Sequence, residues 1–104
     1  MLFIYECFCH VQPQVNQIQF RKNDELYTSL GYRGSLQRGV TAVLGVDDPD
    51  TLQWKKSAQM HAGLQSTLKF TSDMDHFITS GSDGIVNLCD SNKLIPLRSY
   101  DSSE

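Results

Sequence analysis

The sequence has few positive charges, few cysteines and no long apolar run, and each shortage excludes a class of protein. Nine Lys and Arg against twelve Asp and Glu give a formal net charge of −3, whereas nucleic-acid-binding domains usually present a basic face. The most apolar stretch, residues 1–11, is far shorter than the ~20 residues of a membrane-spanning helix and lacks the basic leader of a secretory signal. Three cysteines are an odd number, which favours a reducing compartment over a disulfide framework. We therefore expect a soluble intracellular protein that binds no nucleic acid directly and inserts into no membrane.

Helical periodicity is also scarce, because no long window keeps apolar residues at positions i, i+3, i+4 and i+7. Apolar and polar residues alternate instead, which is typical of half-buried strands, and 104 residues leave room for one domain at most. Pro96 would restrict the last such segment to a sheet edge or a bulge. The sequence thus predicts an all-β protein, with strands that include residues 15–20, 64–70, 77–80, 85–89 and 94–100.

Two stretches of the chain resemble each other at a spacing of about 50 residues. QVNQIQF at residues 14–20 is similar to LQSTLKF at residues 64–70, and each is followed by a polar turn and a second strand that ends in serine. A histidine precedes each unit. Repetition at a fixed period is the signature of stacked, similarly folded units. The landmarks that agree, each pair 51 positions apart, are His10 with His61 and Ser29 with Ser80.

The second unit resembles a blade of the WD40-repeat β-propeller family, in which each blade has four short strands. His61 stands where the family has the histidine that opens a blade, and Cys89 stands where it usually has the tryptophan of Trp-Asp. Asp83, in a GSDG turn, precedes Cys89 by six residues, which is the family's spacing between the turn aspartate and that tryptophan. The resemblance implies a buried hydrogen-bonded network of His61, Ser80 and Asp83. One link of it should be missing, because Cys89 has no indole N–H.

The resemblance also implies how the chain is divided. It predicts two four-stranded antiparallel blades of an incomplete β-propeller: a first blade at residues 11–60, with a loop insertion at 31–39, and a second at 61–104. Residues 1–10 would be the outer strand of a preceding blade. A propeller closes with typically four to eight blades. We therefore expect this chain to be part of a longer propeller, or to associate through its open faces.

Within this family, residues 15–104 look like the middle blades of a small WD40 nucleoporin from the Y-shaped scaffold complex of animal nuclear pores. The likeness rests on blade order, on the turn and strand GSDGIVNL, and on the basic strand and Asp-Ser-Ser that follow. It implies a non-catalytic protein of the nucleus and its pores, without cofactor or metal, whose partners are scaffold subunits or the remaining blades. The alternative is a WD40 adaptor in another complex, such as a ubiquitin-ligase receptor or a chromatin factor, with a cytoplasmic location open.

An enzymatic alternative uses the same three residues. Ser, His and Asp also build hydrolytic triads, so His61, Ser80 and Asp83 are compatible with a small hydrolase-like domain. However, the G-x-S-x-G motif of many serine hydrolases is missing, and each residue falls where a blade needs it. We expect that the protein is not an enzyme.

Two further groups of residues invite a functional reading. The segment CFCH at residues 7–10 offers Cys7, Cys9 and His10 as metal ligands, but no second CxxC or HxxxH completes a tetrahedral site. Arg33 and Arg38 lie in the longer loop of the first unit. Because loops tend to carry partner-specific chemistry, these two arginines are the predicted partner contacts.

Overall fold

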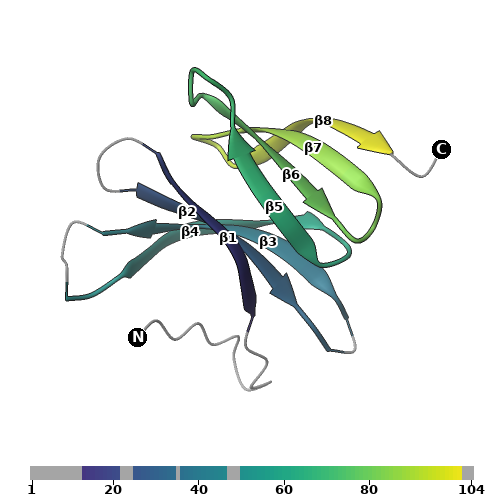
Figure 1. Cartoon of the computed structure of the whole chain (residues 1–104), viewed down its shortest axis with the longest axis horizontal. Helices are drawn as coiled ribbons and strands as arrows, with labels where there is room; N and C mark the ends of the chain where they lie inside the picture. The colour runs from purple at the N-terminus through teal and green to yellow at the C-terminus, as the bar shows by residue number, and fades with distance from the viewer. Residues whose placement is uncertain (1–12, 22–24, 35, 47–49, 102–104) are drawn as a thin grey trace.

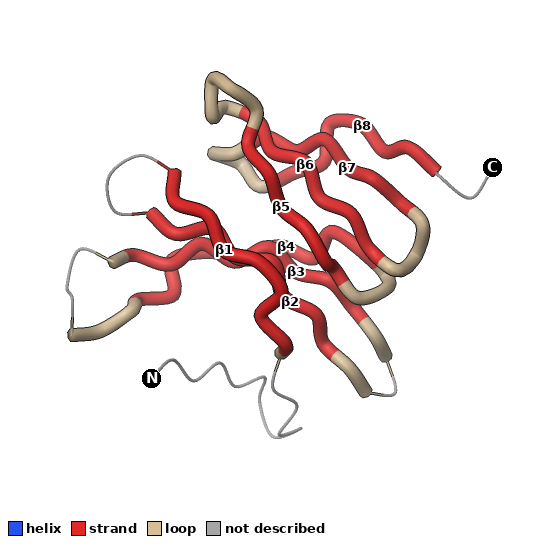
Figure 2. The backbone as a smooth tube through the Cα atoms, in the orientation of Figure 1, coloured by secondary structure: helices blue, strands red, loops and turns tan. Residues whose placement is uncertain are grey.

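The computed structural model describes residues 13–21, 25–34, 36–46 and 50–101, and within them the chain is all-β. Eight antiparallel strands form two four-stranded sheets (Figure 1), and the described residues contain no helix (Figure 2). The strands are β1 Gln14–Arg21, β2 Glu25–Tyr32, β3 Arg38–Gly45, β4 Gln53–His61, β5 Gln65–Phe70, β6 His76–Gly81, β7 Ile85–Asp90 and β8 Ile95–Asp101. The all-β prediction is confirmed.

Each sheet is a simple meander, with strand orders β1-β2-β3-β4 and β5-β6-β7-β8. Within the second sheet, consecutive strands are joined by short turns, such as the one at residues 82–84 between β6 and β7, where Gly84 has a φ of 79°. Such a φ favours glycine. The two sheets pack with one face of each against the other and are not joined by strand pairing, and β1 crosses close to β5 (Figure 1).

The chain divides between the sheets close to, but not at, the predicted boundary. His61 is the last residue of β4 and so belongs to the first sheet by its backbone. The loop of the first unit is also shorter than predicted, because Gly31 pairs with Gly39 inside the β2–β3 ladder. It comprises residues 33–37. The last strand, β8, is an edge strand with a register irregularity where Cys89 pairs with Pro96, as a proline in a strand requires.

The main hydrophobic core lies between the two sheets. Three aromatic rings meet edge to face there: Tyr27 lies 4.9 Å from Phe70 and 5.8 Å from Phe77, between ring centroids. Such pairs add stability beyond that of their buried area. The inner strands alternate, so that side chains such as Tyr27 on β2, Val43 on β3 and Phe77 on β6 enter this core. Its buried members are Tyr27, Val43, Met60, Leu68, Phe77, Cys89 and Leu94.

Candidate functional site

A chain of polar contacts connects the end of the first sheet to the second. The Nδ1 atom of His61 lies 3.1 Å from Oδ1 of Asp83, and Nε2 lies 2.8 Å from Oγ1 of Thr79. A carboxylate can only accept, so Nδ1 carries the proton, and in the neutral imidazole Nε2 then accepts from the Thr79 hydroxyl. The side chain of His61 is fully buried, so both of its ring nitrogens must be satisfied within the protein.

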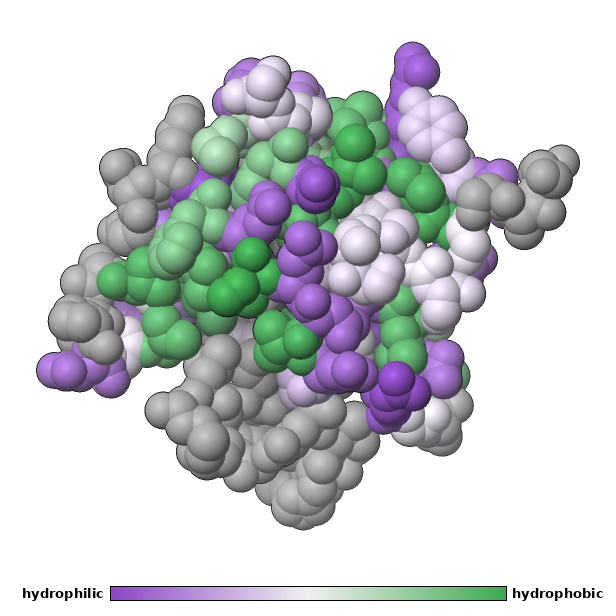
Figure 3. All heavy atoms as spheres, viewed as in Figure 1, coloured by the Kyte–Doolittle hydropathy of each residue, from purple (hydrophilic) through white to green (hydrophobic). Residues whose placement is uncertain are grey.

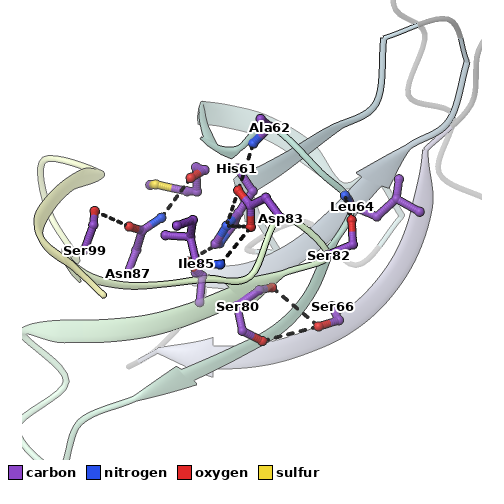
Figure 4. A network of polar contacts seen from close by, with 12 residues as sticks. His61, Ala62, Leu64, Ser66, Ser80, Ser82, Asp83, Ile85, Asn87 and Ser99 are labelled. Carbon is purple, nitrogen blue, oxygen red and sulfur yellow. Dashed lines mark hydrogen bonds and ion pairs between the residues drawn. The ribbon is translucent and has the colours of Figure 1, made fainter. Parts of the chain in front are cut away.

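The carboxylate of Asp83, at the turn between β6 and β7, accepts hydrogen bonds from three donors (Figure 4). Besides His61, the backbone N–H of Ala62 donates to Oδ2 and that of Ile85 to Oδ1, each at 3.1 Å. Desolvation by burial raises the pKa of Asp83, but the Ile85 amide, the His61 ring and the Ala62 amide together outweigh it, so the pKa lies below its ordinary value. The carboxylate is therefore held in its charged form.

The hydroxyl in this network is that of Thr79, which corrects the expectation for Ser80. Successive side chains of a strand point to opposite faces, and Thr79 shares the buried face of β6 with Phe77. Ser80 lies on the other face, where its Oγ is 2.6 Å from Oγ1 of Thr67. The Oγ of Ser80 is also 3.3 Å from Oγ of Ser66 (Figure 4). Periodicity counted from the apolar Phe77 would have identified Thr79.

Cys89 lies beside the network, at the position where the sequence predicted a missing link. Its side chain is buried, and its Sγ donates to Sδ of Met60 at 3.7 Å. Burial raises the pKa of the Cys89 thiol to about 11. The chain of contacts thus runs from Asp83 through His61 to Thr79, and the Cys89 thiol next to it stays neutral.

The connection between the sheets, residues 62–64, is fixed against the β6–β7 turn. The N–H of Leu64 donates to Oγ of Ser82 at 2.8 Å, and the N–H of Ser82 donates to the Leu64 carbonyl at 2.8 Å. Gly63 lies so close that a Cβ added there would be 2.3 Å from Oγ of Ser82. Only glycine permits this approach. The network and the connection together hold the end of β4 onto the second sheet.

Arg21 joins the sheets a second time, and nothing in the sequence singled it out. It is 7% exposed at the end of β1. Its Nε donates to the carbonyl of Met74 at 3.0 Å and its Nη1 to Oδ1 of Asn92 at 2.8 Å. Beside it, the Tyr27 hydroxyl donates to the carbonyl of Ser91 at 2.7 Å. These contacts secure both turns of the second sheet at the end where β1 reaches it.

Amide side chains of β1 bond to the backbone of β5, the first strand of the second sheet. An unpaired strand edge is a template for unwanted pairing, and here a neighbouring strand supplies side-chain partners to that edge. The strand β1 thereby gains three hydrogen bonds to β5 without joining its sheet. The bonds are Leu68 N–H to Gln17 Oε1 at 3.0 Å, Phe70 N–H to Gln19 Oε1 at 3.4 Å, and Asn16 Nδ2 to the Gln65 carbonyl at 2.5 Å.

The two predicted partner contacts, Arg33 and Arg38, flank the β2–β3 loop and are both engaged within the chain. Arg33 is exposed, and its Nη2 donates to Oε1 of Gln14 at 3.3 Å. The guanidinium of Arg38 lies 4.2 Å from the centre of the Tyr32 ring, a cation–π contact. Their role toward a partner stays a prediction. The backbone of Arg38 comes close to the network around His61, because the next residue, Gly39, pairs with His61.

The outer face of the second sheet, which points away from the first sheet, presents apolar side chains to solvent. Ile78 on β6 is 41% exposed and Tyr100 on β8 is 51% exposed, while Val86 and Leu88 on β7 are half-buried. Register places them together, because Ile78 pairs with Leu88 and Val86 pairs with Tyr100. Elsewhere, apolar side chains reach the surface over both sheets, with a polar band between them (Figure 3).

The predicted metal ligands Cys7, Cys9 and His10 lie outside the described residues. Within the described part of the chain, no group of three or more His, Cys, Asp and Glu residues could hold a metal ion. A search of the same residues for a helix long and apolar enough to cross a membrane finds none. Comparisons with known proteins found no matching family model, no similar curated protein and no similar solved structure.

Proposed function

We propose that the protein is a non-catalytic scaffold of the WD40 type, whose assembly is the Y-shaped scaffold complex of the nuclear pore. The observation that carries the proposal is the apolar outer face of the second sheet. Side chains such as Ile78 and Tyr100 remain about half exposed there, and an exposed apolar patch of a soluble domain marks an interaction site. Lys69 and Arg98 lie on the same face by register, so a partner with acidic residues at its rim fits it best.

The polar network supports a structural role over catalysis. Its three central side chains have the order of a hydrolytic triad, with Thr79 in the place of the nucleophile. A nucleophile must reach a substrate, yet Thr79 is fully buried and the side chain of His61 is not exposed to solvent. Each group is instead satisfied by its neighbour, as in a buried network that fixes a packing arrangement. In this proposal the network stabilises the fold. The hydrolase alternative is less well supported, because a substrate could not reach these side chains.

The test is recruitment to purified scaffold complex and to the nuclear rim in cells. We expect the wild-type protein to bind both, and the variant Ile78→Glu with Leu88→Glu to lose binding while keeping its β-type circular dichroism. The matched control is Gln53→Glu with Ser72→Glu, which adds the same charge at exposed polar positions outside that face. Absence of the wild-type protein from the pore, together with face-dependent binding elsewhere, would favour the adaptor alternative.

A further inference from the structure

The two sheets repeat each other in their strand pairing as well as in their sequence. The first two strands of each sheet share a register irregularity, at residues 15–17 in the first sheet and at residues 65–67 in the second. The last two strands of each sheet share another, at residues 43–44 and at residues 88–89. Between these points the pairing runs in the same register, so the paired residues of one sheet have counterparts in the other.

The outer face of the second sheet is the counterpart of the face with which the first sheet packs on the second. Tyr27 lies in the core between the sheets and pairs with Val43. The counterpart of this pair is Ile78 with Leu88, on the face that points away from the core. Ile78 is 41% exposed there. Positions that are covered by a neighbouring sheet in the first repeat are thus open in the second.

We propose that the outer face of the second sheet binds another antiparallel β-sheet, one with acidic side chains, in the geometry in which the two sheets of this chain pack on each other. The inference rests on the proposed function, because it names the kind of partner for the same face. Bulges set the local bend and twist of a strand. Faces at the same positions of two repeats with the same bulges therefore have the same backbone shape, and a sheet that fits one fits the other.

Arg98 indicates the charge that the partner carries along one edge of this face. Its counterpart, Lys56, reaches across the interface from β4, and its Nζ donates to the backbone carbonyl of Asn92 in the β7–β8 turn at 2.5 Å. By this equivalence the exposed Arg98 is directed at the corresponding turn of the partner. A guanidinium has several N–H donors in a fixed fork that matches a carboxylate, so an acidic side chain in that turn is the best match.

Lys69, on the opposite edge strand of the sheet, requires an acceptor too. Its counterpart, Gln19, accepts the backbone N–H of Phe70 at 3.4 Å. An ammonium group can only donate, so Lys69 cannot bond to a backbone amide in this way and needs an acceptor such as a carboxylate. A copy of the second sheet would present the Phe70 amide at this place. An acidic sheet is therefore a better partner than a repeat of this one.

A chain extended by one unit tests the proposal without the scaffold complex. A copy of residues 61–104 is added after residue 102, so that the histidine of the copy stands 42 positions after His61. Counterparts in β4 and β8 are 42 positions apart. Within the copy, Asn92 is left unchanged or replaced, as Asn92→Asp in one chain and Asn92→Lys in another. The three extended chains thus differ only in the charge that they place beside Arg98.

The measurement is the alkylation rate of a thiol introduced in the original second sheet as Ile78→Cys, with Cys7→Ser and Cys9→Ser as background. We expect this thiol to react about tenfold more slowly in the Asn92→Asp extension than in the natural-length chain, since it is reached only when the added sheet opens. The Asn92→Lys extension should protect it least. The control Gln53→Cys, at an exposed position of β4, should react equally fast in all chains.

Three results would overturn the proposal. One is equal alkylation of Ile78→Cys in the extended and natural-length chains, and another is protection that does not depend on the charge in the copy. The third is protection in the natural-length chain that increases with its concentration, which would assign the face to a second copy. Circular dichroism shows whether the added copy folds, and an unfolded copy in all three extensions also contradicts the proposal, since a face that binds such a sheet should stabilise it.

Failure of the proposed function gives a different result. The natural-length chain would then not bind the scaffold complex, while the Asn92→Asp extension would still protect the thiol at position 78.

Discussion

The guanidinium of Arg21 donates its Nε hydrogen to the backbone carbonyl of Met74, 53 residues later in the sequence, at 3.0 Å. Met74 has a φ of 62°, a left-handed conformation that is rare for a residue with a side chain. The turn between β5 and β6 is thus held in an unfavourable backbone geometry where an arginine from the other sheet meets it. The first sheet takes part in shaping a turn of the second.

Replacement of Arg21 by methionine should lower the free energy of unfolding by about 1–3 kcal/mol, because it leaves the Met74 carbonyl and the Asn92 side chain without their donor. Urea denaturation followed by circular dichroism measures this loss. Arg33→Met is the matched control, since Arg33 is exposed and donates to one side chain. Equal losses in the two variants would contradict a special role for Arg21.

The choice between adjacent hydroxyls is tested by Thr79→Val and Ser80→Ala. Valine keeps the shape of threonine but removes the donor to Nε2 of His61, so we expect a loss of about 1–3 kcal/mol in unfolding free energy. Ser80 bonds at an exposed site, and its substitution should stay within about 0.5 kcal/mol of wild type. A larger loss of unfolding free energy in Ser80→Ala than in Thr79→Val would support Ser80, and not Thr79, as the hydroxyl of the network.

Truncation of Asp83 to alanine should cost about 1–3 kcal/mol, because it removes the acceptor for the His61 ring and for two backbone amides. Thermal melting and urea titration both measure the change. Lys69→Ala, at an exposed position of β5, is the control and should be near neutral. An unchanged melting temperature in Asp83→Ala would show that the network does not stabilise the fold.

The same carboxylate should make stability depend on pH. The pKa of Asp83 is lowered in the folded protein, so its contribution is complete above the unfolded pKa of about 3.9 and is lost as pH falls through the lower folded value. Urea midpoints at pH 6 and below pH 4 should therefore differ less in Asp83→Asn than in the wild-type protein. The pKa values of Asp73 and Asp90 are lowered too, which is why the comparison between the two proteins is needed. Parallel pH profiles would contradict the assignment.

The thiol of Cys89 should be unreactive in the folded protein. It is buried, and burial raises its pKa to about 11, so neither access nor thiolate is available near neutral pH. In a variant with Cys7→Ser and Cys9→Ser, a chromogenic disulfide reagent should titrate no thiol at pH 8 and one thiol in urea. Rapid modification without denaturant would show that the core around Met60 opens.

Periodicity was enough to predict the all-β class of the fold. The glycine- and aspartate-rich run at residues 81–84 located the β6–β7 turn, and Pro96 was correctly restricted to an edge strand. The loop at residues 31–39 was predicted too long, because polarity alone does not reveal that Gly31 and Gly39 continue the ladder. In an antiparallel pair the register is set by both strands together.

The polar site was predicted only where a motif fixed its residues. His61 and Asp83 were found by their spacing in the chain, whereas the choice of Ser80 over Thr79 failed because the motif gives a position but not a strand face. Arg21 and the β1 amides carry no local signal at all. Their partners lie about 50 residues away in the second sheet, and their role depends on how the two sheets pack.

The short connection of residues 62–64 has a mechanical consequence. The connection is rigidly fixed, since Leu64 and Ser82 are joined by two hydrogen bonds and the backbone at Gly63 is too close to Ser82 to leave room for a side chain. A load applied to the first sheet would pass straight into the β6–β7 turn instead of being absorbed by a hinge. A protein built into a large assembly would thereby transmit strain between neighbours as a stiff spacer, and lengthening this connection by a few flexible residues would turn the spacer into a joint.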